Sequence, residues 1–457
     1  MKIAVCVKII KGDINPFDAS ALECALRLSD DVTVISMCPP SSKDALLALT
    51  RLGAKVILLS DAIYAGSDTL ATSHILSSAL SKIDYDLIIC GRQTVDGDTA
   101  QVGPCLSAML GIPVITNVME MPVISDKVKC KTRMGEEEAS LPCLITVERI
   151  AELRFPSIRS KVGEVSIWDN SVVGADKEKC GLSGSPTRVL KVFESEDKMR
   201  RCRFIEKEEL IPLIKKLSEE KAEKEEIKEA EIKMPKIYAV GKEVLPVAKK
   251  LSDNVVEIGK KDAKEIAEYL KAENAEVVLW NADLWGRRTA PIVSAMLRTG
   301  LCADCTNLET DGEKLYMYRP AMSGDVYAKI ECRTLPQMAT VRCETKSADI
   351  VVSFGKGAKN SLDEVKILAE SLGAEMAASR GLVDTGKAPY EHQVGLTGKK
   401  VSPKVYVALG ISGAAHHTVG YEGAKYVIAV NNDKDARIFD YADFGVVCDI
   451  EEIVGLF

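Results

Sequence analysis

The sequence predicts an α/β protein of parallel-sheet, Rossmann-like domains, in which two related domains of one type are followed by a third α/β unit. Short β-rich apolar runs alternate with amphipathic stretches, the order typical of a parallel sheet covered by helices. Two segments recur on either side of a charged run, and glycine-rich loops follow strand-like runs towards the C-terminal end. A chain of 457 residues is also too long for one ordinary core, which predicts two or three domains.

The first half has the clearest alternation. Four apolar runs are expected to be strands: IAVCVKI (3–9), VTVISM (32–37), KVILLS (55–60) and DLIICG (86–91). Between them, ALECALRL (21–28) and DALLALTRLG (44–53) are expected to be amphipathic helices. We therefore predict a first α/β domain over residues 1–214.

A charged run interrupts this pattern. KKLSEEKAEKEEIKEAEIK (215–233) is almost entirely charged and ends just before Pro235. Such a run predicts a solvated linker or an exposed helix, assigned here to residues 215–234. Strand-like segments resume with KIYAV, VVEIG and EVVLW, so residues 235–345 are predicted to form a second α/β domain.

An internal repeat relates the two sides of the charged run. PCLSAML (104–110) is answered by PIVSAML (291–297), and LPCLITV (141–147) is answered by LPQMATV (335–341). The two intervals are similar in length and in their alternating apolar positions, which indicates a duplicated α/β domain.

The third unit, residues 346–457, carries four glycine-rich loops. Its expected strands are ADIVVSFG, KVYVALG and KYVIAVN, and its loops are SFGKGAKN (353–360), ASRGLVDTG (378–386), HQVGLTGKK (392–400) and LGISGAAHH (409–417). Ligands of open parallel sheets bind beyond the carboxyl ends of the strands, where glycine lets the backbone approach a phosphate closely. Together the loops predict a dinucleotide-sized site.

Two other readings of short motifs are disfavoured. GISGA resembles a nucleophile elbow, but Ala414 stands where that motif has its last glycine, and no acid–base partners follow in a convincing order. Cys302 and Cys305 form a lone CxxC without further metal ligands, so packing is expected there and no metal site.

Composition excludes some classes of protein. A net charge of −7 argues against nucleic acid as the main partner, because phosphate binding needs a basic surface. No run approaches the ~20 apolar residues of a membrane span, so no integral membrane segment is expected. The 14 cysteines are scattered through apolar runs, which favours a reducing, cytoplasmic location.

The segments quoted above match a known family. The stretch from LVDTGKAPYEHQVGLTGKK through GISGAAHHTVG to VVCDIEEIV closely resembles the FAD domain of the electron transfer flavoprotein α subunit. The resemblance to the α subunit extends back to YRPAMSGDVYAKIECRTLPQMATVR (318–342). GRQTVDGDTAQVGP (91–104) and ELRFPSIRS resemble the β subunit. The resemblance implies a fusion of both subunits in one chain, with an FAD-binding domain at the C-terminal end.

The resemblance also implies which residues hold FAD. In the family, the position of His417 lies near the flavin pyrimidine edge as a cationic donor, that of Thr397 near N5, and that of Arg380 on the isoalloxazine face. The implied FAD contacts are Gly355, Lys356, Gly357, Ser379, Arg380, Gln393, Val394, Gly395, Thr397, Gly398, Ser412, Gly413, His417, Asn431 and Asp449. His416 has no clear counterpart. Two departures are Lys356, where the family commonly has arginine, and the short start of the second half at KIYAVGK, where one expected strand is missing or supplied from elsewhere.

A second nucleotide is implied at GRQTVDGDTAQVGP. From the residues alone, Asp96 and Asp98 are equally well read as caps of the following helix. The resemblance implies that this loop binds AMP in conventional members and a second FAD in electron-bifurcating members, which oxidise NADH. The form of the loop, with YAGSDTLATS (64–73), favours the bifurcating type, and the implied contacts are Asp96, Gly97, Asp98, Thr99, Gln101 and Val102.

The loop ELRFPSIRSKVG (152–163) matches the segment with which β subunits dock into an acyl-CoA dehydrogenase. Ile158 takes the place of the family's apolar anchor, and Arg154, Arg159 and Lys161 are expected to steer an acidic partner. The alternative is a plain connection between sheet and arm.

Three functions remain open at this point. They are a one-FAD, one-AMP electron carrier, an NADH-oxidising bifurcating protein, and an adenine-nucleotide sensor without redox chemistry. The partners expected for the carriers are an acyl-CoA-dehydrogenase-like or other flavoprotein dehydrogenase, and a ferredoxin, flavodoxin or quinone-side acceptor.

Overall fold

The computed structural model describes residues 1–194, 199–220, 230, 232–322, 326–345, 347–395 and 398–454. Contacts between residues divide the chain into two compact units. Unit 1 comprises Met1–Val192, Glu229–Met322 and Ala328–Arg342, and unit 2 comprises Phe193–Lys228, Ser323–Tyr327 and Cys343–Phe457. Each unit is described by itself below.

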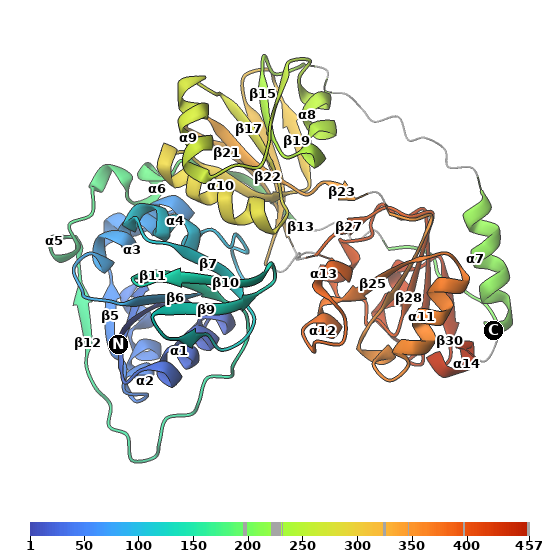
Figure 1. Ribbon diagram of the computed structural model, residues 1–457, viewed down its shortest axis with the longest axis horizontal. Coiled ribbons are helices and arrows are strands. Elements are labelled where there is room, and N and C mark those ends of the chain that lie inside the picture. Colours follow the sequence, from blue (N-terminus) through green and yellow to red (C-terminus); the bar gives the residue numbers. More distant parts are fainter. Residues whose placement is uncertain are drawn as a thin grey trace. The chain divides into compact units, whose positions relative to one another are not determined.

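The first part of unit 1 is built on a mostly parallel sheet (Figure 1). In sheet order, its strands within the described residues are β10 (Gly135–Ser140), β9 (Lys127–Thr132), β7 (Val114–Val118), β11 (Cys143–Val147), β6 (Leu87–Gly91), β1 (Lys2–Cys6), β4 (Asp31–Met37), β5 (Lys55–Leu59) and β12 (Val165–Trp168), with β8 (Val123–Ile124) beside β9. Neighbouring strands are parallel along the series β7, β11, β6, β1, β4, β5 and β12. Strands β9 and β10, at the other end of the sheet, form an antiparallel hairpin. The predicted strands are confirmed.

Helices cover both faces of this sheet. Helices α1 (Pro16–Leu28) and α2 (Lys43–Thr50) pack Leu22 and Leu46 into one core, and α3 (Thr69–Leu80) and α4 (Val102–Leu110) pack Ile75 and Leu106 into the other. Proline in the first turn of α1 suits a helix start, because its missing N–H has no helical partner there. Short elements complete this part: β2 (Ile9–Ile10), β3 (Asp13–Ile14), α5 (Asn170–Val173) and α6 (Gly181–Gly184).

The second part of unit 1 repeats the core of the first. Its parallel sheet has the order β16 (Val255–Ile258), β15 (Ile237–Val240), β17 (Val277–Asn281), β22 (Gln337–Val341) and β18 (Leu301–Cys305). This is the order of β4, β1, β6, β11 and β7 in the first part. Helices α8 (Leu245–Leu251), α9 (Ala263–Ala272) and α10 (Leu284–Leu297) flank it, and α10 packs against α4. The duplication predicted from the sequence is therefore present in the fold.

A small sheet joins the two repeats. It runs β13 (Thr187–Glu194), β21 (Val326–Cys332), β20 (Leu315–Ala321) and β19 (Asn307–Thr310). Its first strand comes from the N-terminal half of the chain, so the first half contributes a strand beside the second repeat.

Unit 2 holds a parallel sheet of its own (Figure 1). Among the described residues its order is β14 (Arg203–Phe204), β30 (Phe444–Val447), β29 (Tyr426–Asn431), β28 (Val405–Leu409), β24 (Ile350–Phe354), β25 (Glu375–Ser379) and β26 (Gln393–Val394). All neighbouring pairs are parallel. The remaining elements are α7 (Leu210–Glu219), α11 (Leu362–Ser371), α12 (Arg380–Val383), α13 (Ala415–Thr418), α14 (Ile450–Val454), and β23 (Glu344–Thr345) paired with β27 (Lys400–Val401).

The contacts divide the chain differently from the predicted boundaries. Residues 1–214 were expected in one domain, but β14 pairs with β30 and so belongs to unit 2. The charged run was predicted to be a solvated linker or an exposed helix, and its first residues form the end of α7, whose Leu210, Ile214 and Leu217 are buried in the core of unit 2. These three residues form an apolar stripe at helical spacing. Only Leu217 of the three lies within the charged run, so the composition of the run does not reveal the stripe. Residues 221–229 and 231 of the predicted linker lie outside the described residues.

In the described part of the chain, no helix is long and apolar enough to cross a membrane. All 14 cysteines are free thiols, and Cys302 and Cys305 lie buried in β18. No group of three or more potential metal ligands occurs among the described residues.

Candidate functional site

A cavity of about 900 Å³ opens in unit 1 at the carboxyl ends of β1, β4, β5 and β6. The sheet order changes direction between β1 and β6, since β4 and β5 follow on one side of β1 and β11 and β7 lie beyond β6. Ligands of open parallel sheets bind at such a switch point. The cavity walls combine apolar side chains, including Leu59, Tyr64 and Leu76, with polar groups from Lys8 and Gln93.

The loop singled out from the sequence forms part of this cavity. Gly97, Thr99, Gln101 and Val102 line it. Asp96 accepts a hydrogen bond from Lys8 Nζ (2.6 Å), and Asp98 accepts one from Gln93 Nε2 (2.7 Å). The helix-cap reading of these two aspartates is wrong, because the N-cap residue of α4 is Gln101 and no side chain caps it. Their carboxylates instead shape the loop.

Asp18 is a cavity residue that the sequence analysis missed. It lies in the first turn of α1, is buried, and lines the cavity beside Gly91. Its Oδ2 accepts a hydrogen bond from the Lys8 N–H (2.8 Å). Burial raises the pKa of Asp18 to about 7, against hydrogen bonds from Lys8, Asn15 and Gly91 that favour the charged form. An acidic residue in the first turn of a helix is common, so the sequence position of Asp18 does not indicate that its side chain is buried.

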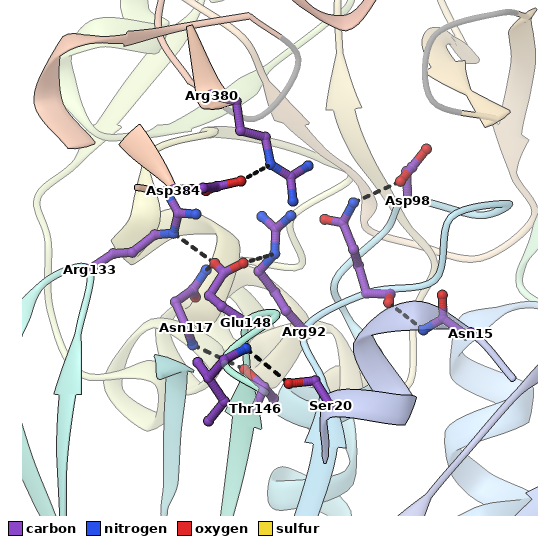
Figure 2. Close-up of polar contacts among 12 residues, drawn as sticks. Asn15, Ser20, Arg92, Asp98, Asn117, Arg133, Thr146, Glu148, Arg380 and Asp384 are labelled. Carbon is purple, nitrogen blue, oxygen red and sulfur yellow. Dashed lines mark hydrogen bonds and ion pairs between the residues drawn. The ribbon is translucent and has the colours of Figure 1, made fainter. Parts of the chain in front are cut away.

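A buried ion cluster holds the neighbouring strand ends together (Figure 2). Glu148 pairs with Arg133 Nε (2.7 Å) and Arg92 Nε (3.2 Å), and it accepts a hydrogen bond from Asn117 Nδ2 (3.4 Å). Thr146 Oγ1 accepts a hydrogen bond from the Asn117 N–H (3.1 Å). The cluster joins the ends of β6, β7 and β11, since each of these residues lies at or just beyond one of those strands or, for Arg133, in the β9–β10 turn.

In unit 2 the predicted glycine-rich loops meet at one edge of the sheet. Strands β24 and β28 are adjacent, with β25 and β26 on one side and β29 and β30 on the other, so the switch point lies between them. The Gly355 N–H donates to Leu409 O (2.9 Å) and the Gly357 N–H to Gly410 O (3.0 Å). A Cβ on Gly355 would lie 2.3 Å from Gly410 O, so this glycine is required by the close approach of the two loops.

Two cations lie at this edge. The side chain of Lys356 crosses Gly381, where an added Cβ would lie 2.9 Å from Lys356 Cε. Arg380, the residue just before Gly381, begins α12 and pairs with Asp384 through Nε (3.3 Å). Lys356 and Ser412 are exposed, and Ser379 and Arg380 are half-buried, so these side chains are accessible to a ligand at the sheet edge.

His417 is buried, and both nitrogens of its ring form hydrogen bonds to other groups of the protein. Its Nδ1 lies 3.1 Å from Val394 O and its Nε2 lies 2.9 Å from Tyr406 Oη. A carbonyl oxygen can only accept, so Nδ1 carries the proton and Nε2 of the neutral ring accepts from Tyr406. Burial lowers the pKa of His417 to about 4. The expectation of a cationic His417 is therefore wrong for this structure, because desolvation outweighs the hydrogen bond to Val394.

The other predicted FAD residues divide by exposure. Gln393, Val394, Gly395 and Gly413 are buried, and a Cβ on Gly413 would lie 2.3 Å from Ile438 N. Asn431 Nδ2 donates to Ile411 O (3.0 Å) and so supports the loop that carries Ser412, whereas Asp449 is exposed and accepts from Asn432 Nδ2 (2.7 Å). Gly398 is a packing position, since a Cβ there would lie 2.1 Å from Gln393 O. Thr397 lies outside the described residues.

The predicted docking loop projects its apolar side chains into solvent. Ile158 is 98% exposed and Phe155, which the sequence analysis did not single out, is 96% exposed. The steering role expected for Arg154 is wrong, because Nε and Nη2 of Arg154 bind both oxygens of the buried Glu23 (2.9 and 3.0 Å). The Arg154 N–H also donates to Glu23, so this arginine anchors the loop to α1.

Comparison with known families decides the identity of the fold. The electron transfer flavoprotein domain matches residues 4–172 and 256–367, which together make up more than half of the chain. The chain belongs to the electron transfer flavoprotein family. Residues 344–422 match the electron transfer flavoprotein FAD-binding domain.

Individual relatives divide between the two subunits of electron transfer flavoproteins. The chain is 44% identical over 235 residues to electron transfer flavoprotein subunit beta of Megasphaera elsdenii (42% of this chain, 87% of the relative). It is 36% identical over 239 residues to electron transfer flavoprotein subunit alpha of Thermoanaerobacterium thermosaccharolyticum (42% and 72%). It is also 41% identical over 221 residues to protein FixA of Azotobacter vinelandii (44% and 79%). The chain thus joins a β-like N-terminal half to an α-like C-terminal half.

The residues present in unit 2 fit the FAD expected for an electron transfer flavoprotein. A diphosphate-bearing dinucleotide needs cations and hydroxyl or backbone donors at the carboxyl edge of a parallel sheet. Lys356, Arg380, Ser379 and Ser412 supply those groups on the loops after β24, β25 and β28. The donor set is therefore suited to FAD.

Proposed function

We propose that this electron transfer flavoprotein carries FAD in unit 2 and a second FAD in the cavity of unit 1, and that it oxidises NADH for electron bifurcation. The observation that carries the proposal is the cavity of about 900 Å³ at the β1–β6 switch point. Small-molecule sites span roughly 300–1,000 Å³, and a volume near the upper end favours a dinucleotide over AMP. The apolar walls at Leu59, Tyr64 and Leu76 suit an aromatic ring system.

In unit 2, bound FAD supplies the one- and two-electron chemistry. Lys356 and Arg380 would hold its negative charges, and Ser379 and Ser412 would offer hydroxyl donors. His417, fixed as the Nδ1–H tautomer by Val394 and Tyr406, acts as a neutral polar group that orders the loop after β28. Thr397, which lies outside the described residues, would act on the bound FAD, a role that rests on the family resemblance alone.

The decisive experiment is the nucleotide content of the purified chain. Nucleotides are released by denaturation and FAD and AMP are counted per chain. We expect two FAD and no AMP, with bleaching on addition of NADH. One FAD and one AMP would make the protein a conventional carrier, and adenine nucleotide without FAD would favour a sensor.

A cavity-filling variant assigns the second nucleotide to unit 1. Ala62 is exposed and lines the cavity, so Ala62→Trp places an indole in its mouth. Ala48, on α2, is exposed but does not line the cavity, so Ala48→Trp adds the same group elsewhere. We expect one FAD per chain in Ala62→Trp and two in Ala48→Trp. Equal content in both variants would place the second nucleotide outside the cavity.

We further propose that residues 152–163 dock onto a flavoprotein dehydrogenase of the acyl-CoA-dehydrogenase type, with a ferredoxin, flavodoxin or quinone-side protein as acceptor. Two almost fully exposed apolar side chains, Phe155 and Ile158, on a loop anchored by Arg154 support an apolar docking anchor. Ile158→Asp is expected to weaken binding of the dehydrogenase by about tenfold or more. Val123→Asp is the control, since Val123 is exposed on β8 outside the loop.

A further inference from the structure

Arg319 links the second repeat of unit 1 to the nucleotide loop of the first. It lies on β20, is 5% exposed, and donates a hydrogen bond from Nη1 to Gly97 O (2.8 Å). The next link is made by Met322, whose N–H donates to Asp96 O (3.2 Å). Two consecutive carbonyl groups of the loop are thus held by a segment more than 200 residues away in sequence, since Gly97 and Arg319 are 222 residues apart.

The loop held in this way has a strained backbone. Asp98 and Ala100 have φ values of 51° and 54°, in the left-handed region that residues with a Cβ seldom adopt. Such conformations persist when surrounding contacts over-determine them. Within the first repeat, Lys8 binds Asp96 and Gln93 binds Asp98, so the carbonyl contacts from the second repeat complete a set that fixes the loop from both sides.

Arg319 also lies within the electrostatic influence of a half-buried carboxylate, that of Asp304. Asp304 pairs with Arg287 Nε (2.9 Å) and Arg342 Nη2 (3.3 Å). The charges of Arg287, Arg342 and Arg319 lower the pKa of Asp304 despite its burial. Asp304 therefore stays ionised, pairs with Arg287 and Arg342, and attracts the charge of Arg319, the arginine that donates to Gly97.

We propose that Arg319 is a positioning residue for the nucleotide cavity of unit 1, and that through it nucleotide binding in the first repeat is coupled to the packing of β20 in the second. The proposal rests on the second nucleotide of the proposed function. Gly97 lines the cavity, and its carbonyl is set by Arg319, so a ligand that orders the loop also orders β20. The coupling is reciprocal, because two linked equilibria affect each other equally.

Matched variants separate this role from a general contribution to stability. Arg319→Met and Arg287→Met each remove one arginine from Asp304, but only the first removes the donor to Gly97. The probes are AMP and FAD, each titrated into protein depleted of the cavity nucleotide by dialysis with unit 2 kept loaded with FAD. We expect a dissociation constant at least tenfold higher for Arg319→Met and less than threefold higher for Arg287→Met. Arg319→Lys, which keeps a cationic donor, is expected to restore part of the affinity.

Hydrogen–deuterium exchange of the unaltered protein provides the second readout. Binding of the probe is expected to slow exchange of the amides in Leu315–Met322, above all at Met322, whose N–H binds Asp96. In Arg319→Met this protection is expected to be lost while α1 and α3 are still protected.

The outcomes distinguish the coupling from the function on which it rests. If Arg319→Met binds the probe as the parent does, or if the parent shows no added protection in Leu315–Met322, the coupling is wrong and the nucleotide site stands. If the parent binds neither probe in the cavity, and Ala62→Trp changes nothing, both the proposed function and the coupling are wrong.

Discussion

The two repeats of unit 1 share a backbone but not their charges. Helices α4 and α10 both end in a left-handed residue, Gly111 and Arg298. A second left-handed residue follows in each repeat, Asn117 (φ 59°) and Asp304 (φ 56°). In each case its N–H is bound by a threonine hydroxyl, from Thr146 (3.1 Å) and Thr340 (2.8 Å).

The charges at the corresponding positions are reversed. In the first repeat Thr146 is followed, two residues on, by Glu148, an anion surrounded by arginines; in the second, Thr340 is followed by Arg342, a cation that pairs with Asp304. The backbone geometry was retained because the left-handed residue and its threonine are parts of one hydrogen-bonded unit. The charge was free to change sign, provided that each buried ion kept a partner.

The largest loss of stability is expected when the anion of either repeat, Glu148 or Asp304, is removed. Glu148→Gln and Asp304→Asn each leave buried arginines without their carboxylate, and each is expected to destabilise the protein by about 3–5 kcal/mol. Urea unfolding measures the loss. Glu120→Gln breaks the exposed pair with Lys131 and is expected to change stability by less than about 1 kcal/mol. Equal effects in all three variants would contradict the argument.

Two aspartates of unit 1, the buried Asp18 and the half-buried Asp304, should respond to pH in opposite directions. The pKa of Asp18 is raised to about 7 by burial, so between about pH 4 and 7 the folded state keeps a proton that the unfolded state has released, and stability falls as pH rises. A pKa raised by about 3 lowers the free energy of unfolding by about 4 kcal/mol at pH 7, relative to its value at acid pH. Asp18→Asn is expected to remove this slope in pH-dependent unfolding.

Asp304 provides the contrast. Its pKa is lowered, by arginine charges that outweigh burial, so its contribution is present above its ordinary pKa of 3.8 and is lost as pH falls below that value. Asp304→Asn is expected to flatten the acid limb of the same curve and leave the neutral region parallel to the parent. A neutral-region slope unchanged in Asp18→Asn would show that Asp18 ionises normally.

A smaller, equal effect is expected from the two threonines. Thr146→Val and Thr340→Val keep the shape of the side chain but leave the Asn117 and Asp304 N–H groups without an acceptor, which costs about 1–3 kcal/mol in each repeat. Thr116→Val is the matched control, because the Thr116 hydroxyl is buried without a hydrogen-bond partner. The control is expected to be neutral or stabilising in thermal unfolding, and a loss as large as that of Thr146→Val would contradict the role of the hydroxyl.

The smallest effect is expected at the helix ends. Arg298→Gly relieves a left-handed conformation and is expected to stabilise the protein by about 1 kcal/mol, and Gly111→Arg is expected to destabilise it by a similar amount. A Cβ on Gly111 meets no atom within 4 Å, so backbone strain is the only obstacle to the second change. Changes of the same sign in both variants would contradict this account.

The sequence by itself determined the features that depend on neighbours along the chain. Alternating apolar runs predicted the parallel strands of both units, and the PCLSAML and PIVSAML segments predicted the duplication. The glycine-rich loops predicted that a ligand binds where they meet, at one edge of the sheet in unit 2. These patterns are local: they have the periods of strands and helices, or they match segments only a few residues long. They can therefore be recognised without knowing which distant residues come into contact.

Only the tertiary structure decided burial, charge state and partner. Glu23 pairs with Arg154 across 131 residues and so ties residues 152–163 to α1, and Arg319 reaches Gly97 across 222 residues. Asp18 gains a raised pKa, and His417 remains neutral, because other elements cover them. Desolvation and ion pairing depend on distances through space, which no local pattern encodes.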